Sequence, residues 1–205
     1  NPNITAIIPG SGIDVKKFYF TPLPDYNEIN FLLISRLLWD KGIGEFMEAA
    51  KKIKLKYTKV NFHILGATDK ENPSGIDSET INKWINEKIV KFHNETLDVR
   101  DYILKSHCLI LPSYREGTPK SLLEGMSMGR PIITTDVPGC NHLIESNKNG
   151  YLCEVKNINS LTIVIEKFIN LNNHKKNQMG INARNIIEKK FTFEKVLAEY
   201  NKIIN

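Results

Sequence analysis

The 205-residue chain has few of the features that mark several protein classes. Its only cysteines, Cys108, Cys140 and Cys153, show no C-x-x-C spacing, which argues against a disulfide framework or a zinc site. No apolar run approaches the about 18 residues that cross a bilayer, and the first residues lack a signal-peptide pattern. The sequence therefore predicts a cytoplasmic protein with reduced cysteines.

Patterns for binding metals or nucleic acids are also lacking. The five histidines have no metal-ligand spacing, so no metal cofactor is expected. The lysines are spread along the chain and form no basic patch interleaved with aromatic residues, which argues against a nucleic-acid partner. The net charge of +5 is mild and suits small anionic ligands, or a peripheral position at the inner face of a membrane.

Apolar strands and amphipathic helices alternate along the chain, whose hydrophobic fraction of 41% is enough for a real core. Strands are predicted at 30–35, 60–66, 88–93, 107–113, 130–136 and 151–155. Helices are predicted at 43–57, 78–87 and 99–106, from Thr118 onward, and in the C-terminal tail, where the last follows a cap at Thr192. This alternation predicts one α/β domain over residues 1–205, with a Rossmann-like doubly wound parallel sheet and C-terminal helices.

Polar loops follow the predicted strands. In a parallel sheet these loops meet at the carboxyl edge, where ligands bind. The loops in question begin after Ser35, Gly66, His93, Pro112 and Asp136. We expect a ligand crevice at this edge.

The stretch EGTPKSLLEGMSMG, residues 116–129, has the composition of a helix start. Thr118 is a suitable N-cap, Pro119 suits the first helical position, and Gly117 frees the turn before them. The N–H groups of Lys120, Ser121 and Leu122 would then lack intrahelical partners and form an anion site. Lys120 is unfavourable beside the positive end of the helix dipole, and a bound di-anion would offset that.

Two carboxylates flank this predicted anion site. Glu124 lies about 9 Å along the helix axis from the cap, within reach of a ribose joined to a diphosphate. Glu116 precedes the cap, where a second hydroxylated group would lie, and this pairing suits a nucleotide sugar. Either glutamate alone is more often an ordinary surface charge, but the combination with the helix start favours a site.

Arg36 and Lys41 follow the first predicted strand and would project toward the same crevice. An arginine grips phosphate with a planar fork and a lysine supplies a point charge, although alone the two form an ordinary solvated pair. The glycines of PGSGID, residues 9–14, lack the rest of a phosphate-loop motif. They predict a flexible turn before Asp14.

Four segments in this order resemble the carboxyl-terminal domain of family 4 (group 1) glycosyltransferases, which are retaining enzymes of the GT-B fold. The segments are IPGSGIDVKKF (8–18), ISRLLWDKGI (34–43), SYREGTPKSLLEGMSMGRPIITTDVPG (113–139) and NGYLCEV (149–155). The third contains the family's E-x7-E pattern, formed by Glu116 and Glu124. The resemblance covers essentially the whole chain.

The resemblance implies a role for each matched position. Arg36 and Lys41 would hold the donor diphosphate and stabilise charge on the leaving nucleotide, and Glu116 would bind hydroxyls of the donor sugar. Gly117, Thr118, Pro119 and Lys120 would form the loop against the sugar, and Ser121 and Leu122 would give N–H groups to phosphate. Glu124 would accept from the ribose, and Phe92 and His93 would lie against the base. The resemblance implies that no metal takes part.

The resemblance also implies a function. The expected donor is a UDP-hexose or UDP-N-acetylhexosamine, and the expected acceptor a glycan or polyprenyl-linked sugar. Where the family often has E-G-F-G, this chain has Glu116-Gly117-Thr118-Pro119. This form resembles that of enzymes that assemble bacterial surface polysaccharides, such as O-antigen, lipopolysaccharide or capsule. The family's amino-terminal acceptor domain is absent from the sequence, so we expect a half-enzyme with little activity alone.

Two alternatives stay open at this point. A nucleotide-sugar epimerase of related GT-B architecture would need catalytic acids that the sequence does not let us assign. A non-catalytic Rossmann-like module that binds a partner protein would show no nucleotide affinity. It would also leave the grouping of Arg36, Lys41, Glu116 and Glu124 without a purpose.

Overall fold

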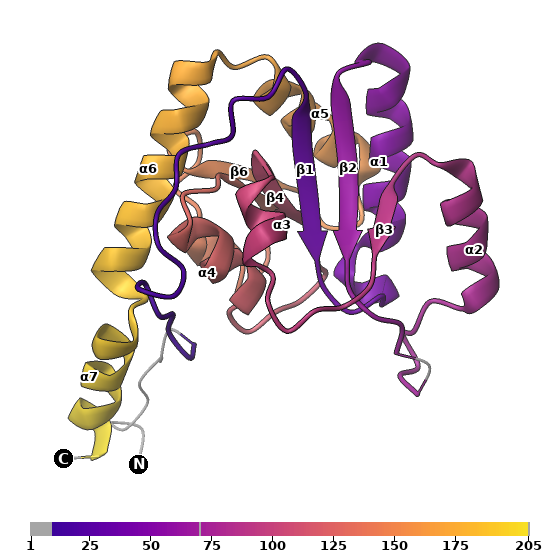
Figure 1. The fold of residues 1–205 in the computed structure, drawn as a ribbon. Helices are drawn as coiled ribbons and strands as arrows, with labels where there is room; N and C mark the ends of the chain where they lie inside the picture. The colour runs from indigo at the N-terminus through magenta and orange to yellow at the C-terminus, as the bar shows by residue number, and fades with distance from the viewer. Residues whose placement is uncertain (1–9, 70, 205) are drawn as a thin grey trace.

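The computed structural model describes residues 10–69 and 71–204 and, within them, a six-stranded sheet (Figure 1). Every strand pair is parallel, and the spatial order is β3-β2-β1-β4-β5-β6. The strands are β1 (Ile29–Ile34), β2 (Val60–Leu65), β3 (Lys91–His93), β4 (Cys108–Leu111), β5 (Ile132–Thr135) and β6 (Gly150–Cys153). The predicted doubly wound, Rossmann-like sheet is confirmed.

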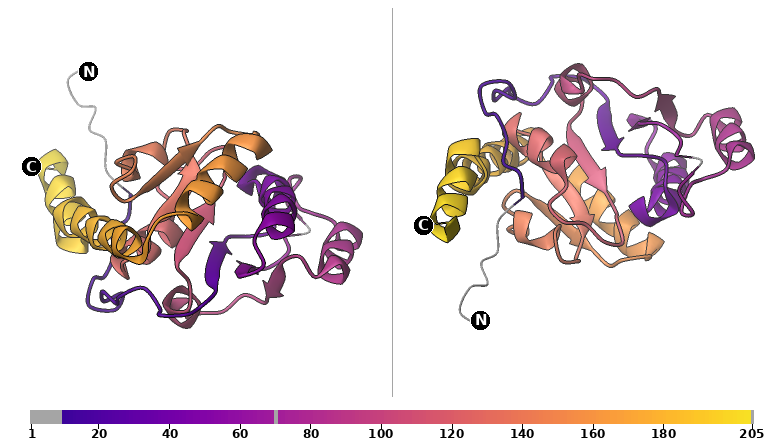
Figure 2. Two further views of the ribbon diagram at one scale, coloured as in Figure 1. Left: turned by 90° about the horizontal axis from the view of Figure 1, so that it is seen from above. Right: turned by 90° about the horizontal axis from the view of Figure 1, so that it is seen from below.

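Helices cover both faces of the sheet, as the end-on views of Figure 2 show. The α-helices are α1 (Ile43–Lys56), α2 (Ser78–Glu87), α3 (Arg100–Leu104), α4 (Lys120–Ser127), α5 (Ile158–Ile169), α6 (Asn173–Lys190) and α7 (Phe193–Ile204). Helix α1 packs against α5 on one face, and α4 packs against α6 on the other. In the part of the chain that the structure describes, two single-turn 3-10 helices, Trp39–Lys41 and Asn141–Leu143, lie in loops.

Each face of the sheet has its own buried apolar cluster. Side chains alternate along a strand, so in β1 Phe31 and Leu33 contact the cluster under α1 and α5, whereas Leu32 joins the cluster under α4 and α6. From Phe31 onward β1, and the whole of β4, are therefore apolar on both faces, which explains their continuous hydrophobic runs.

Most predicted elements are confirmed with shorter bounds. The strand predicted at 88–93 begins only at Lys91, because Lys88 ends α2 in the left-handed region with φ 55°. The long helix α6 was not separated from the rest of the tail, since its sequence is mostly polar; its buried residues include Met179, Ala183 and Ile187. None of the helices in the described ranges combines the length and apolarity that a transmembrane segment requires.

The segment before β1 follows the prediction of a turn. Gly10 and Gly12 take φ values of 76° and 73°, and the Asp14 carboxylate accepts hydrogen bonds from the N–H groups of Lys16 and Lys17. Residues 8 and 9 of the first family-like segment lie outside the described residues. At the other end, the N–H of Lys195 donates to Thr192 Oγ1 at 3.3 Å, which confirms the predicted cap.

Candidate functional site

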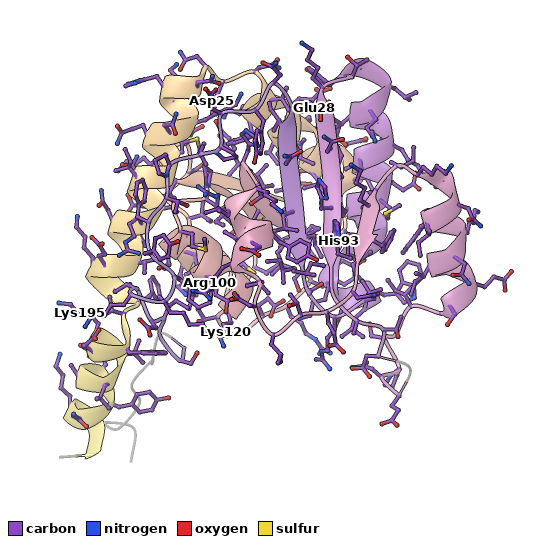
Figure 3. The ribbon with its side chains drawn as sticks, in the orientation of Figure 1. Asp25, Glu28, His93, Arg100, Lys120 and Lys195 are labelled. Atoms are coloured by element: carbon purple, nitrogen blue, oxygen red, sulfur yellow. The ribbon has the colours of Figure 1, made fainter. Side chains whose placement is uncertain are left out.

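Loops from three strands are joined at the carboxyl edge of the sheet. The N–H of Leu37, after β1, donates to the carbonyl of Ala67, after β2, at 2.8 Å. The N–H of Tyr114, after β4, donates to the carbonyl of Asp40 at 2.8 Å. Figure 3 shows His93 and Lys120 toward this edge and Glu28 at the opposite end of the sheet. The loops that carry the predicted site residues therefore form one connected surface.

The structure brings two predicted residues, Lys41 and Glu116, into direct contact. Lys41 Nζ lies 2.7 Å from Glu116 Oε1, and the two side chains are only 18% and 14% exposed. The loops approach closely because Gly42 has φ 70°, and a Cβ there would lie 2.1 Å from the carbonyl oxygen of Pro112. Glu116 is therefore a paired, largely buried carboxylate and not a solvated loop charge.

Arg36 has a different partner. Its Nη1 lies 2.7 Å from Asp69 Oδ2 in the loop after β2, and the arginine side chain is 61% exposed. Arg36 and Lys41 thus lie on one loop at the same edge, but each contacts its own carboxylate. Sequence reasoning missed Asp69, although its place in the polar loop after a neighbouring strand was a usable signal.

Helix α4 starts one residue later than predicted. Pro119 is the N-cap, with φ −66° and ψ 117°, and Lys120 is the first helical residue, so the assignment of Thr118 as the cap was wrong. The extended ψ of Pro119 keeps it outside the helix, and its carbonyl accepts from the N–H of Leu122 at 3.1 Å. The prediction of a free N–H at Leu122 was therefore also wrong. Among the described residues, the N–H groups of Lys120 and Ser121 have no recorded acceptor.

Glu124 lies on a buried part of α4. The residue is 8% exposed, and this burial raises the pKa of its carboxyl group. Helix α4 sits so close to β4 that a Cβ on Gly125 would lie 2.5 Å from Leu109 Cδ2. Lys120 Nζ is 3.9 Å away, and within the described ranges no hydrogen-bond donor is recorded for the carboxylate. Glu124 is thus fixed in place with free capacity to accept hydrogen bonds.

Glycines shape the loop from Glu116 to Pro119. Gly139, after β5, has φ 86°, and a Cβ there would lie 2.1 Å from the carbonyl oxygens of Glu116 and Gly117. A Cβ on Gly10 would lie 2.8 Å from Thr118 Cβ. At Gly117, by contrast, an added Cβ would meet nothing within 4 Å. The loop is therefore held from two sides and open at Gly117.

Phe92 and His93 point to opposite faces of β3. Phe92 packs against the apolar cluster under α1 and α5, which also includes residues of α2. His93 stacks on His63, with 3.0 Å between His63 Nδ1 and His93 Nε2. A cavity of about 290 Å³ lies beside Phe92 at the carboxyl edge, and its lining includes Gly66, Thr68, Ile85, Phe92, His93 and Asn94. The side chains of Phe92 and His93 therefore cannot stack on the same face of one planar ligand.

A second set of contacts, missed in the sequence, supports the Lys41–Glu116 pair. The hydroxyl of Tyr114 donates to Glu45 Oε1 at 2.7 Å, and Ser113 Oγ donates to the carbonyl of Asp40 at 3.1 Å. Tyr114 precedes Glu116 by two residues, and Asp40 precedes Lys41 by one. These bonds fix the two loops relative to each other. The only sequence signal for them was that Ser113, Tyr114 and Asp40 lie close to predicted site residues along the chain.

This arrangement offers both charges that a sugar diphosphate needs. Lys41 and the two N–H groups at the start of α4 provide positive potential, which suits phosphate oxygens. Glu116, before this helix start, and Glu124, within the helix, are carboxylates that can accept hydrogen bonds from hydroxyl groups. Within the described ranges, no group of three or more histidine, cysteine, aspartate or glutamate side chains is placed to hold a metal ion.

Comparison with known proteins relates the chain to sugar-transferring proteins. Residues 15–186 match the family model described as glycosyl transferases group 1. The chain is 32% identical, over 78% of its length, to an N,N'-diacetylbacillosaminyl-diphospho-undecaprenol alpha-1,3-N-acetylgalactosaminyltransferase of Campylobacter jejuni, of which it covers 44%. It spans about half the length of the first curated relatives that it matches, from 44% to 48%.

Solved structures show the same fold. A TarM mutant of S. aureus, in complex with fondaparinux, alpha-GlcNAc-glycerol and UDP, superposes with a TM-score of 0.78 at 28% identity. That match covers 91% of this chain and 38% of the other. The C-terminal domain of a glycosyl transferase group 1 protein (LpcC) from Francisella tularensis superposes with a TM-score of 0.74 at 18% identity. This match covers 88% of this chain and 99% of that domain.

Proposed function

Because the chain belongs to the glycosyl transferases group 1 family, we propose that it is the donor-binding half of a sugar transferase. The transferase moves a sugar from a nucleotide sugar to a glycan or lipid-linked acceptor, with retention at the anomeric carbon. The observation that carries this proposal is the contact of Lys41 with Glu116 beside the open start of α4.

In the proposed complex, the diphosphate lies at the start of α4. The N–H groups of Lys120 and Ser121 point out of the helix end and are free to donate to phosphate oxygens. Lys41 lies at the neighbouring loop and stabilises the charge that develops on the leaving nucleotide. Arg36 contributes a second positive charge once it exchanges Asp69 for phosphate.

The sugar and the ribose lie on either side of the diphosphate. Glu116 accepts hydrogen bonds from donor-sugar hydroxyls, and the loop through Gly117, Thr118 and Pro119 lies against the sugar, where the open space at Gly117 permits close approach. Glu124 accepts from the ribose. The base enters the cavity of about 290 Å³ beside Phe92.

We propose a UDP-sugar as the donor and surface polysaccharide as the product. The TarM structure contains UDP, and the C. jejuni relative is named for N-acetylgalactosaminyl transfer to an undecaprenol-linked sugar. Another relative is the capsular polysaccharide glycosyltransferase CapM of Staphylococcus aureus, at 26% identity. A lipid-linked acceptor would place the protein at the inner face of a membrane.

Charge compensation in the proposed complex comes from protein cations and N–H groups. Two cations and two open N–H groups are available to neutralise a diphosphate, so we propose binding without a metal ion. The acceptor site belongs to the other half of the transferase, and we propose that this chain alone binds the donor with little or no turnover. Sugar transfer catalysed by the isolated chain would contradict that part of the proposal.

Isothermal titration calorimetry with UDP, ADP and GDP, with and without magnesium, tests the proposal. We expect saturable binding of UDP that is the same without magnesium. Lys41→Ala removes the main charge on phosphate and should weaken UDP binding by about tenfold or more. Lys52→Ala, which removes an exposed lysine bonded to Asn159, is the matched control. Absence of affinity for all three nucleotides would instead favour a module that binds protein partners.

Glu116→Ala separates sugar recognition from nucleotide recognition. The substitution removes the partner of Lys41, so free UDP should bind as well as before or more tightly. UDP-N-acetylglucosamine or UDP-glucose should lose affinity relative to UDP, because the hydroxyl acceptor is gone. Equal weakening of UDP and of the UDP-sugars would count against the role assigned to Glu116.

A further inference from the structure

A second cavity, of about 550 Å³, lies on the face of the sheet that carries α3. Helix α3 has only five residues and leaves parts of β1, β2 and β3 uncovered. Figure 3 shows the length of this face, with Glu28 near the amino edge of the sheet and His93 toward the carboxyl edge. The lining residues are Tyr26, Glu28, Asn30, Leu32, Asn61, His63, Lys91, His93, Asp101, Tyr102, Lys105 and Ser106. Of these, only His93 is among the predicted donor-binding residues.

The strand residues that line this cavity are unexpectedly polar. A doubly wound sheet is normally apolar on both faces. Here β1 presents Asn30, and β2 presents Asn61 and His63, toward the cavity. Polar side chains at these positions contribute nothing to an apolar core, so packing does not explain them.

Hydrogen bonds hold these side chains in fixed orientations. Asn61 Nδ2 donates to Glu28 Oε2 at 2.6 Å and lies 3.1 Å from Asn30 Oδ1. Asn30 Nδ2 in turn donates to the carbonyl of Lys105 at 3.0 Å. The ring of Tyr102 meets the ring of His93 edge-on at 5.0 Å. The groups are thus positioned before any ligand arrives.

Several polar atoms in the cavity still have hydrogen-bonding capacity. Within residues 10–69 and 71–204, no partner is recorded for Glu28 Oε1, Asn61 Oδ1, or the hydroxyl groups of Tyr26 and Tyr102. Amide and carboxylate oxygens accept hydrogen bonds, whereas a phenol hydroxyl both donates and accepts. This mixture complements the hydroxyl groups of a sugar, each of which also donates and accepts.

The charges around the cavity balance. Glu28 and Asp101 oppose Lys91 and Lys105, and burial lowers the pKa of His63 to about 4, so its ring is neutral at pH 7. A phosphorylated or sulfated ligand would find no excess of positive charge here. The volume lies in the range of about 300–1,000 Å³ that small-molecule sites occupy.

We propose that this cavity is a second carbohydrate site, which binds a neutral, hydroxyl-rich glycan segment apart from the donor crevice. Tyr26 and Tyr102 supply ring faces and hydroxyls, and the row of Glu28, Asn61 and Asn30 supplies the fixed polar contacts. The site does not depend on the proposed donor function, since it shares only His93 with it.

Nuclear magnetic resonance titration of the labelled chain with uncharged chitotriose and maltotriose tests the proposal. We expect saturable, millimolar-range shifts of backbone amides in β1, β2, β3 and α3 for at least one trisaccharide. Asn61→Ala and Tyr102→Phe, which remove polar groups from the cavity, should each weaken that binding by about fivefold or more. Asn82→Ala, on the exposed surface of α2, should leave it unchanged.

Three results would overturn the proposal. These are no saturable shift with either sugar, shifts confined to the loops around Glu116, or binding that Asn61→Ala leaves intact. A parallel titration with UDP keeps the two proposals apart, because Asn61→Ala should not change UDP affinity. A variant that loses only UDP affinity has been altered at the donor crevice, whereas a variant that loses only trisaccharide affinity has been altered at this cavity.

Discussion

The carboxylate of Glu124 occupies a buried position on α4 where an apolar side chain would incur no electrostatic penalty. Burial raises its pKa, which means that the folded protein disfavours the charged form. A buried carboxylate with a perturbed pKa beside a helix start is a candidate for a functional role. Glu124 accordingly combines a cost in folding free energy with a proposed role at the ribose.

We therefore expect Glu124→Gln to stabilise the protein at neutral pH by the order of 1 kcal/mol. Because the folded-state pKa is raised, the folded state binds more protons than the unfolded state between the ordinary and the raised pKa, so the penalty grows as pH rises through that window. The advantage of the variant should disappear below about pH 4, where the carboxyl is protonated in both states. Urea denaturation at pH 7 and at pH 4 measures this, and UDP affinity should fall in the same variant.

Gly117 and Gly139 separate the needs of folding from those of ligand binding. An added Cβ at Gly117 meets no atom within 4 Å, so Gly117→Ala should leave the free energy of unfolding within about 0.5 kcal/mol of the wild type. The same change at Gly139, with φ 86° and two carbonyl oxygens at 2.1 Å, should destabilise the protein clearly. Thermal unfolding of both variants makes the comparison. Gly117→Ala should nevertheless weaken UDP-sugar binding, and unchanged binding would argue against a sugar at this loop.

Single positions show how far sequence reasoning reaches. The E-x7-E spacing singled out Glu116 and Glu124, which the structure places as largely buried carboxylates near the start of α4, while their roles stay predictions. The partners Asp69 and Glu45 lie 33 and 69 positions along the chain from Arg36 and Tyr114 and share no motif with them. Such pairs depend on how loops meet at a sheet edge, which a local pattern cannot reveal.

The elements around α4 are tied together by a buried arginine. Arg130 precedes β5, is fully buried, and donates to the carbonyls of Ile103 and Thr21 at 2.9 and 3.0 Å. Burial lowers its pKa to about 10, so the side chain stays charged at neutral pH. Its carbonyl partners connect the segment before β1 to α3.

Arg130→Ala should destabilise the protein by about 3 kcal/mol or more, since it leaves a large cavity and unpaired buried carbonyls. Arg130→Lys should restore little of this, because an ammonium group cannot reproduce the planar, forked donor set. Guanidinium denaturation of both variants measures the difference. Full restoration by lysine would mean that charge, not geometry, is what the site requires.

The start of β4 contains an acid-sensitive contact with β1. His107 Nδ1 accepts from the N–H of Asn30 at 3.1 Å, and burial lowers the pKa of His107 to about 4. The unfolded state binds more protons than the folded state between about pH 6.5 and 4, so stability should fall as pH decreases through this window. His107→Asn should be less stable at pH 7 but lose less between pH 7 and pH 5. Urea midpoints at both values provide the check, and His63, with a pKa also near 4, keeps some of the dependence.

Element boundaries were predicted where caps and apolar runs coincide. The helix at 78–87 was predicted with its observed bounds, and Asp77 caps it by accepting from the N–H of Thr80. The start of α4 was placed one residue early, because the preference of proline for the first helical position gave way to an extended backbone at Pro119. Helix α6 was not predicted as a separate helix of the C-terminal tail, because its buried face is narrow and its sequence is mostly polar.

Taken whole, the molecule is a parallel sheet with the proposed donor site at one edge and the second cavity on one face. The predicted sheet followed from alternation and right-handed crossovers, rules that act on the complete chain. The polar face over β1, β2 and β3 was not predicted, because the apolar residues of those strands dominate their pattern. Which face a strand residue occupies is settled only by the register of its neighbours.

Ligand binding should be felt by the entire domain. UDP at about 100 times its Kd would stabilise the folded state by about 2.7 kcal/mol. For a chain of this length that corresponds to a rise in Tm of about 5–10 °C. Differential scanning fluorimetry with UDP measures the shift, and Lys41→Ala should reduce it at the same UDP concentration. An unchanged shift in that variant would place the nucleotide elsewhere.

The contact between Lys41 and Glu116 neutralises both charges within the protein, so a ligand at this crevice has to replace an existing ion pair. A ligand that offers only phosphate would bind the Lys41 ammonium and leave the largely buried Glu116 carboxylate without its partner. A ligand that offers only hydroxyl groups would bind Glu116 and leave Lys41 without its partner. In the proposed complex, a nucleotide sugar presents both phosphate and hydroxyl groups and so replaces the internal pair without leaving either charge unpaired. We therefore expect free nucleotide and free sugar to bind less favourably than the intact nucleotide sugar.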